Sequence, residues 1–410
     1  MASDPTTPTT PTSPSTPTSP TDDREATREW LENILENYHK SLAPNSRPDI
    51  ELREWSVSPA SGGEREGYLS EQLSVGVSYS ARGQNHHAHL LAKLLPQDPF
   101  NRAFVIETLF DLREIKFYTE IKPALEGVER QYLTEDCLSL VWTPELYYAK
   151  HKEASESILV LADMCQRGYK MQDLTEGLTL SQVQSALTTV ANVHAAALAL
   201  QMKEKKPLQE RYPYLLSMEQ AVESFNCLVE RGLPLLLKFL ASRKDRAAVR
   251  EGLQRYSGQR TVEVLRGILA PSDKLNTLVH CDFWCNNLLF KKEGDTTRCC
   301  VIDWQTVMYG RPAIDVAMLL CTSLEVSQRR KHQTELLSHY WDAFTSRLTK
   351  FGIEKAAVKY TEDDLKGDFK AAQAMAALVV VGSVDIALGN AAREERVLEL
   401  LTDLLNVGVL

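Results

Sequence analysis

Hydrophobic and polar residues alternate along the first part of the chain. Apolar residues occupy every second position over 71–80, which predicts a half-buried strand. A polar turn at 82–85 separates this strand from a second apolar stretch at 89–95, so the pair is predicted to form a β-hairpin. A further strand is expected at 157–161. The first part of the chain is therefore predicted to form a small antiparallel sheet.

Helical spacing of apolar residues characterises most of the remaining chain. Trp30, Ile34 and Leu35 predict a first amphipathic helix over 24–39, and a second is expected over 103–121. Longer amphipathic stretches follow at 179–202, 217–241, 245–269, 325–350 and 364–406, with only two short β-like pieces at 288–290 and 300–302. The pattern predicts the α+β class, with a small sheet-containing N-terminal lobe and a larger, mainly helical C-terminal lobe.

The N-terminus has a composition of its own. Residues 2–21 are almost entirely Thr, Pro and Ser, which bury little and block regular structure, so we expect residues 1–22 to form a disordered tail. We place the lobe boundary near a change from strand-rich to helix-rich sequence. The expected domains are then an N-terminal lobe over 23–164 and a C-terminal lobe over 165–410.

Composition limits the classes of function. The 410 residues carry 46 Lys and Arg against 55 Asp and Glu, a formal net charge of −9, which argues against a protein that binds nucleic acid or an anionic membrane through a basic face. The eight cysteines show no regular spacing, so reduced thiols are expected. The N-terminus lacks the pattern of a secretory signal, and the apolar stretch 375–388 is too short to span a bilayer. We therefore predict a cytoplasmic protein with no nucleic-acid or membrane partner; the oligomeric state is not predicted.

The segment 280–287 carries the most informative chemistry. Asp282 is followed five positions later by Asn287, and Asp303 comes after an apolar strand. Phosphotransferases with a protein-kinase-like fold need this order of groups. The first carboxylate would orient the acceptor hydroxyl as catalytic base, while the Asn oxygen and the second carboxylate are hard ligands suited to Mg²⁺. Any one of these residues alone would more simply be a turn or capping residue.

Two charged residues upstream fit the same hypothesis. Lys93 lies in an apolar strand, and Glu114 lies on the apolar face of the next predicted helix. Each would be costly to bury alone, whereas a pair directed at the phosphates of a nucleotide is reasonable. Glu107 lies on a similar face and is the alternative carboxylate; the aromatic residues around Glu114 favour the latter.

These motifs together resemble the ecdysteroid kinase-like family, a branch of the choline kinase and aminoglycoside phosphotransferase superfamily. The resemblance extends from about residue 55 to the C-terminus and is most specific at 280–290, HCDFWCNNLLF, and at 301–305, VIDWQ. It implies a two-lobed protein-kinase-like fold and ATP- and Mg²⁺-dependent phosphorylation of a hydroxyl group on a small molecule, such as an ecdysteroid or another lipophilic alcohol. It also implies that His280 and Asp315 support the catalytic loop.

The sequence departs from the family pattern at three places. Cys281 stands where the family usually has Gly, and Ala162 stands where a hinge Glu is usual, although the backbone of 161–164 could still contact adenine. The phosphate-covering turn is a loose one, with Gly62, Gly63 and Gly67 as the expected nucleotide-binding glycines. The first two departures motivate an alternative function, a catalytically inactive nucleotide-binding or interaction protein of the same fold.

Other polar clusters have simpler explanations. The histidines at 86–89 lack accompanying ligands, and the cysteines near Asp282 lack metal-binding spacing, so neither is expected to hold zinc. His194 is expected to be a hydrogen-bonded core residue. The acceptor pocket is expected within 208–269, where either a cavity wall or ordinary helix packing would account for a group of apolar residues: Phe225, Leu228, Leu235, Leu236 and Phe239.

Overall fold

The computed structural model describes residues 24–45, 48–60, 69–134, 142–173 and 175–409. The chain divides into two compact units, the first comprising residues 1–96 and 146–162 and the second comprising residues 97–145 and 163–410. By packing, residues 97–145 therefore group with the second unit. The expected lobes at 23–164 and 165–410 are assignments of function and stay predictions. The tail predicted at 1–22 lies outside the described residues.

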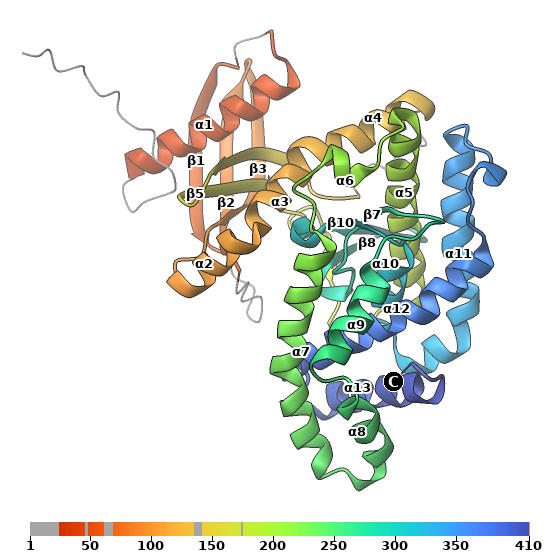
Figure 1. The fold of residues 1–410 in the computed structure, drawn as a ribbon. Helices are drawn as coiled ribbons and strands as arrows, with labels where there is room; N and C mark the ends of the chain where they lie inside the picture. The colour runs from red at the N-terminus through yellow and green to blue at the C-terminus, as the bar shows by residue number, and fades with distance from the viewer. Residues whose placement is uncertain (1–23, 46–47, 61–68, 135–141, 174, 410) are drawn as a thin grey trace, which may run out of the picture. The chain divides into compact units, whose positions relative to one another are not determined.

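The first unit is built on a five-stranded antiparallel sheet (Figure 1). The strand order is β1-β2-β3-β5-β4. The strands are β1 (Ile50–Pro59), β2 (Glu71–Ala81), β3 (Gln84–Leu94), β4 (Leu146–Lys152) and β5 (Glu156–Ala162). Helix α1 (Arg24–Leu42) buries Trp30, Leu31 and Ile34 in a common core with alternate residues of β2, among them Val75 and Val77. The small antiparallel-sheet lobe is thus confirmed.

The β2–β3 hairpin closes through a two-residue turn. Arg82 and Gly83 have φ angles of 52° and 74°, the conformation that a tight hairpin requires at both central positions. Pairing continues up to Ala81 opposite Gln84. The predicted hairpin is confirmed, and its second strand begins earlier than expected because the polar residues 84–87 continue the ladder.

The second unit is mainly helical. Its longer helices are α2 (Pro99–Thr108), α3 (Phe110–Lys116), α4 (Lys122–Tyr132), α5 (Leu180–Glu204), α7 (Met218–Ala241), α8 (Ala247–Gln254), α9 (Gln259–Leu269), α10 (Ala313–Thr322), α11 (Val326–Lys350), α12 (Glu362–Gly382) and α13 (Ala391–Asn406), together with the single turn α6 (Leu208–Arg211). Its short strands are β6 (Lys170–Met171), β7 (Thr277–Val279), β8 (Leu288–Glu293), β9 (Thr296–Val301) and β10 (Met308–Gly310). The α+β class is therefore confirmed, with the larger unit helical.

The helix predicted over 103–121 is interrupted. Helix α2 begins at Pro99, where the side chain of Asp98 accepts a hydrogen bond from the Asn101 amide at 2.8 Å. It ends at Thr108, the following Leu109 has a left-handed φ of 57°, and α3 starts at Phe110. A π-helical turn η1 (Phe117–Ile121) then leads into α4. The prediction of one continuous helix was wrong because a conformation unfavourable for leucine is imposed at residue 109.

Among the described residues, one helix is long and apolar enough to cross a membrane by length and composition. This helix is α5, and most of its apolar stretch is buried in the second unit. It packs against α11, β9 and β7. Its hydrophobicity is therefore that of a core helix.

Two glycines allow α7 and α12 to approach closely. A Cβ atom on Gly232 would lie 2.0 Å from the carbonyl oxygen of Val381, and one on Gly382 would lie 2.8 Å from Cβ of Leu228. Real Cβ atoms do not make contacts this short, so a side chain at either position would push the helices apart.

We predict that Gly232→Ala destabilises the protein by about 1–3 kcal/mol, the usual cost of overpacking a core. Gly367, on the partner helix α12, has open space around its Cβ position. Gly367→Ala is the matched control and should stabilise the protein by up to about 1 kcal/mol through helix propensity alone. Calorimetric melting of the three proteins compares them directly. Equal effects of the two substitutions would show that close helix approach is not the cause.

Candidate active site

The loop 280–287 follows β7 and is held by a buried carboxylate. Asp315, in the first turn of α10, has no solvent-exposed surface. Its Oδ2 accepts a hydrogen bond from the backbone N–H of His280 at 2.8 Å, and its Oδ1 accepts one from the N–H of Cys281 at 2.9 Å. Two consecutive backbone amides are thus bound to the two oxygens of one buried side chain, which fixes the start of the loop.

His194 of α5 holds the same carboxylate from its other side. The His194 Nε2 lies 3.1 Å from Oδ2 of Asp315, and its Nδ1 lies 2.7 Å from the hydroxyl of Tyr340. All three side chains are buried. The prediction that His194 is a hydrogen-bonded core residue is confirmed, and its bond to Asp315 makes it a support of the loop.

Cys281 adopts a glycine-like conformation. Its φ is 66°, in the left-handed region that most residues avoid at a cost of roughly 1–2 kcal/mol. This is the position where the family resemblance leads us to expect Gly. The Cys281 side chain is fully buried, and burial raises the pKa of its thiol well above the usual range. Cysteine therefore keeps the loop geometry of glycine here and adds a neutral side chain.

The structure brings Asp282 and Asn287 into direct contact. The Asn287 Nδ2 donates to the backbone oxygen of Asp282 and to its Oδ2, both at 2.8 Å. Because the amide nitrogen is directed at Asp282, the amide oxygen is the atom left to coordinate a cation. The backbone oxygen of Asn287 accepts a hydrogen bond from Ile302 at 3.0 Å, which aligns the residue before Asp303 with the loop.

Asp303 completes the cluster from a strained backbone position. Its φ and ψ are 66° and 62°, and it precedes the 3₁₀ turn η5 (Trp304–Thr306). The Trp304 ring stacks on Phe117 of η1 with centroids 4.0 Å apart, and the Thr306 hydroxyl donates to the backbone oxygen of His280 at 2.9 Å. Packing on one side and a hydrogen bond on the other thus hold the turn that carries Asp303.

The electrostatics of the cluster suit a divalent cation. Burial raises the pKa of Asp282, the negative charge of Asp303 raises it further, and His280 opposes the shift. Two carboxylates that repel each other beside an available amide oxygen form a donor set that Mg²⁺ accepts. Among the described residues there is no group of three or more His, Cys, Asp or Glu side chains that could hold a metal ion.

The other predicted nucleotide-binding residues lie elsewhere in the chain. Lys93 lies on β3 of the first unit, opposite Leu159 of β5, and Glu114 is buried on α3 of the second unit. Glu107 is exposed on α2, so burial favours Glu114 over it. The assignment of Lys93 and Glu114 to a nucleotide site stays a prediction.

Two further sequence predictions concern the phosphate-covering glycine turn and the hinge after β5. Gly62, Gly63 and Gly67 lie outside the described residues. Ala162, the departure in the expected hinge, is the buried last residue of β5. Asp163 follows and accepts a hydrogen bond from the Cys165 amide at 2.9 Å.

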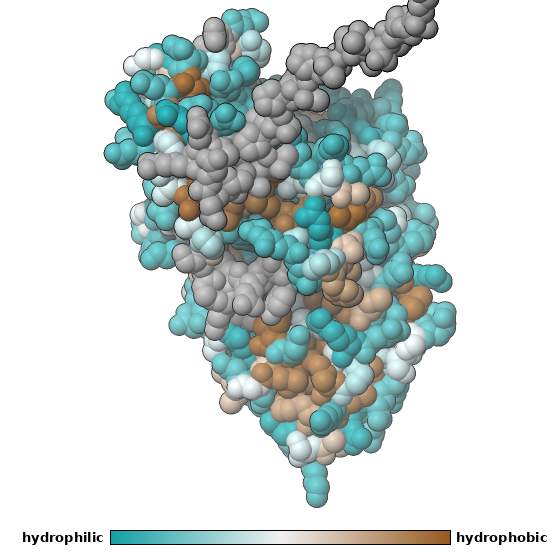
Figure 2. Space-filling view, turned by 90° about the vertical axis from the view of Figure 1, so that its left-hand side faces the viewer, coloured by the Kyte–Doolittle hydropathy of each residue, from teal (hydrophilic) through white to brown (hydrophobic). Residues whose placement is uncertain are grey.

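The apolar residues expected at the acceptor pocket differ in their exposure, and Phe239 is half-buried. Phe225 and Leu236 are buried on α7, so ordinary helix packing explains them. Leu228 and Leu235 are 36% and 43% exposed, and Ile386 beyond α12 is 44% exposed. Figure 2 shows apolar side chains gathered on the surface at the level of α7. Only the exposed members could contact an acceptor.

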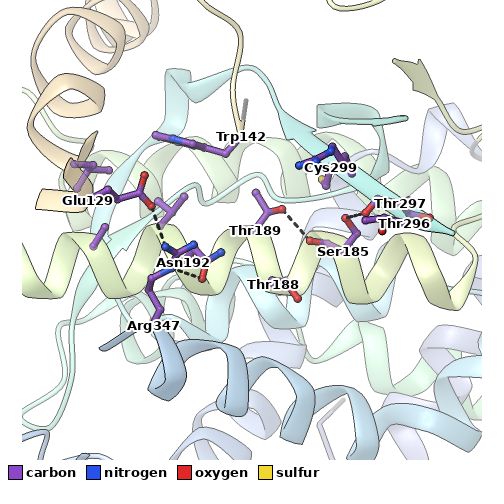
Figure 3. A pocket seen from close by; sticks show the side chains of 14 residues that line it. Glu129, Trp142, Ser185, Thr188, Thr189, Asn192, Thr296, Thr297, Cys299 and Arg347 are labelled. Carbon is purple, nitrogen blue, oxygen red and sulfur yellow. Dashed lines mark hydrogen bonds and ion pairs between the residues drawn. The ribbon is translucent and has the colours of Figure 1, made fainter. Parts of the chain in front are cut away.

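A cavity of about 390 Å³ in the second unit is lined by residues of α4, α5, β9 and α11 and by Trp142 (Figure 3). Several of its polar side chains bond to one another or to the surrounding backbone. Ser185 donates to the Thr297 carbonyl at 2.7 Å, and Arg347 donates to Asn192 at 2.8 Å. None of the predicted site residues lines the cavity.

The family model described as the ecdysteroid kinase-like family matches residues 64–353. The chain belongs to the ecdysteroid kinase-like family. This match covers most of the chain, including the loop 280–287 and Asp303, and confirms the resemblance found in the sequence. It supports a kinase-like transferase.

Solved structures that resemble this family member include small-molecule kinases. An ethanolamine kinase of Plasmodium vivax has 10% sequence identity and a TM-score of 0.44, with 95% of this chain and 90% of that chain covered. A choline kinase of Cryptosporidium parvum has 12% identity and a TM-score of 0.45, with 94% and 98% covered. The choline kinase LicA of Streptococcus pneumoniae has 14% identity and a TM-score of 0.42, with 92% and 99% covered. No curated protein sequence matches the chain.

The raised pKa of Asp282 predicts that its charge opposes folding. A carboxyl whose pKa is higher in the folded than in the unfolded state stabilises the fold at low pH, and that stability is lost as the pH rises through the folded-state pKa. Asp282→Asn removes the charge but keeps an acceptor for Asn287. The variant should therefore melt at a higher temperature than the wild type at pH 7 in the presence of a chelator.

The gain should disappear below about pH 4, near the ordinary pKa of aspartate, where the wild-type carboxyl is protonated in both states. Melting curves between pH 3.5 and pH 8 check this. A stability difference that does not change over this range would contradict a raised pKa.

Proposed function

We propose that the protein transfers a phosphoryl group from ATP to the hydroxyl group of a small molecule and that the transfer depends on Mg²⁺. The observation that carries the proposal is the contact between Asp282 and Asn287 in the loop 280–287. Asp315 anchors this loop, and the charge of Asp303 acts on Asp282. Phosphoryl transfer depends mainly on positioning and charge neutralisation, and a rigid cluster of this kind supplies both.

Each residue of the cluster has a distinct role in the proposal. Asp282 accepts a hydrogen bond from the acceptor hydroxyl, orients it towards the phosphorus and takes its proton. Asn287 and Asp303 hold Mg²⁺, which neutralises the phosphate charge when bound. Because the Asn287 amide nitrogen is held by Asp282, the catalytic base and one metal ligand are fixed relative to each other.

The nucleotide would also contact residues upstream. In the proposal Lys93 binds the phosphates, Glu114 orients Lys93, and Gly62, Gly63 and Gly67 cover the phosphates. Lys93 lies between β2 and β5 in the middle of the sheet, where its backbone is fixed on both sides. This position suits a residue that must hold one point charge in place.

The acceptor we propose is a lipophilic alcohol, for example an ecdysteroid or a related sterol. The family membership supports this class, and so does the exposed apolar surface formed by Leu228, Leu235 and Ile386 in the second unit. We place the protein in the cytoplasm. The eight cysteines of the sequence show no regular spacing that would indicate a disulfide framework, which fits a reducing compartment.

The runner-up is a protein that binds nucleotide without turnover. The two departures at Cys281 and Ala162 motivated it. Cys281 keeps the left-handed conformation suited to glycine, and Asp282 next to it keeps its contact with Asn287, so this departure does not favour loss of activity.

Asp282→Asn should reduce phosphoryl transfer by at least 10³-fold while ATP binding persists, because the base is lost but the metal ligands stay. The measurement is ATP-dependent phosphorylation of a library of lipophilic alcohols, followed by mass spectrometry. Asp295→Asn is the control, since Asp295 is an exposed carboxylate on the β8–β9 turn and its loss should leave turnover unchanged.

The two functions give different outcomes. Turnover by the wild type that Asp282→Asn abolishes is the expected result. If the Asp282→Asn variant turns over as fast as the wild type, Asp282 is not the catalytic base. Binding of Mg²⁺ and ATP by the wild type with no product from any alcohol would favour the inactive protein.

A further inference from the structure

A buried arginine joins three segments around the cluster. Arg113 on α3 has no exposed surface. Its Nη1 donates to the backbone oxygen of Gln305 at 2.8 Å, its Nε to that of Tyr214 at 3.1 Å, and its Nη2 to that of Thr108 at 3.1 Å. Sequence reasoning assigned Arg113 no role, although its position on the apolar face of a predicted helix was a signal.

The charge of Arg113 persists in this environment. Burial lowers its pKa to about 10, and the nearby Asp111 opposes that shift, so the guanidinium remains a cation at neutral pH. A buried cation is costly unless its donors are satisfied. Here each of its three nitrogens has a backbone acceptor, and each acceptor comes from a different part of the chain.

The break between α2 and α3 serves this arrangement. Leu109 adopts a left-handed conformation, which is unfavourable for a residue with a side chain. The break ends α2 at Thr108, whose carbonyl accepts a hydrogen bond from the Arg113 guanidinium. Because hydrogen bonds from a charged donor are stronger than those between neutral groups, this bond helps to offset the strain.

The position of Arg113 and two of its acceptors matter for the proposed reaction. Gln305 is two residues after Asp303 in the turn η5, and Arg113 itself is next to Glu114 on α3. Tyr214 lies three residues before Ser217, the N-cap of α7. Helix α7 carries the exposed Leu228 and Leu235. One side chain therefore fixes the turn of the metal ligand, the helix of Glu114 and the approach to α7.

We propose that Arg113 is a positioning residue for the metal site: it holds the turn that carries Asp303 through the Gln305 carbonyl, so that the Asp303 carboxylate and the Asn287 amide oxygen would be available to one cation. The inference rests on the proposed function. Arginine is required because its planar fork reaches three acceptors in different directions, whereas the compact ammonium group of lysine has no such fork.

Arg113→Lys tests this role. The variant keeps the charge but loses at least one of the three bonds, so the turn that carries Asp303 should loosen. We expect the Mg²⁺ concentration needed for half-maximal ATP binding to rise about 10-fold, measured by titration calorimetry without any acceptor. If turnover is detected, saturating Mg²⁺ should restore most of kcat.

Arg329→Lys is the matched control. Arg329 is also a buried arginine of the second unit, but it pairs with Asp403 on α13 and touches none of the three segments. The Arg329→Lys substitution should lower the melting temperature and leave the Mg²⁺ dependence of ATP binding unchanged.

If the Arg113→Lys variant fails to fold, the substitution is made together with Leu109→Gly, which removes the strain of the left-handed conformation.

The outcomes separate this role from the proposed function. A folded Arg113→Lys variant with wild-type Mg²⁺ dependence, or an Arg329→Lys variant with the same shift, would overturn the positioning role. A wild type that binds Mg²⁺ and ATP but phosphorylates no alcohol would contradict the proposed function and leave the binding test of Arg113 intact.

Discussion

The hydrogen bonds from two consecutive backbone amides to the carboxylate of Asp315 are the constraint on which the site depends. They fix His280 and Cys281, and Cys281 can then be held in a conformation that costs free energy for any residue with a side chain. Asp282 is the next residue, so the position of its backbone is fixed by the two anchored residues before it. The supports of Asp315 on α5 and α11, His194 and Tyr340, are themselves buried, so the anchor is set by the core of the second unit.

Local sequence pattern was sufficient for the elements with strong periodicity. The β2–β3 hairpin and α1 follow from alternation and helical spacing. The contact between Asp282 and Asn287 is also local, because the two residues are five positions apart in one loop. These features need no knowledge of the distant chain.

Long-range interactions account for the features that the pattern did not predict. The break at Leu109 is unfavourable locally and is stabilised by Arg113, whose other acceptors lie about a hundred and two hundred residues away in the sequence. The environments of the α7 residues were equally unpredictable, because α7 is apolar on more than one face. Which face is buried is decided by contact with α12 at Gly232 and Gly382.

The two glycines also connect the outer helices to the chemistry. Helix α12 packs against α7 on one side and against α10 on the other, and α10 carries Asp315. The close approach of α7 and α12 at these glycines is therefore one helix away from the helix that carries the loop anchor. A side chain at position 232 would act on a helix that also contacts α10, so small residues far from the loop belong to the packing that supports it.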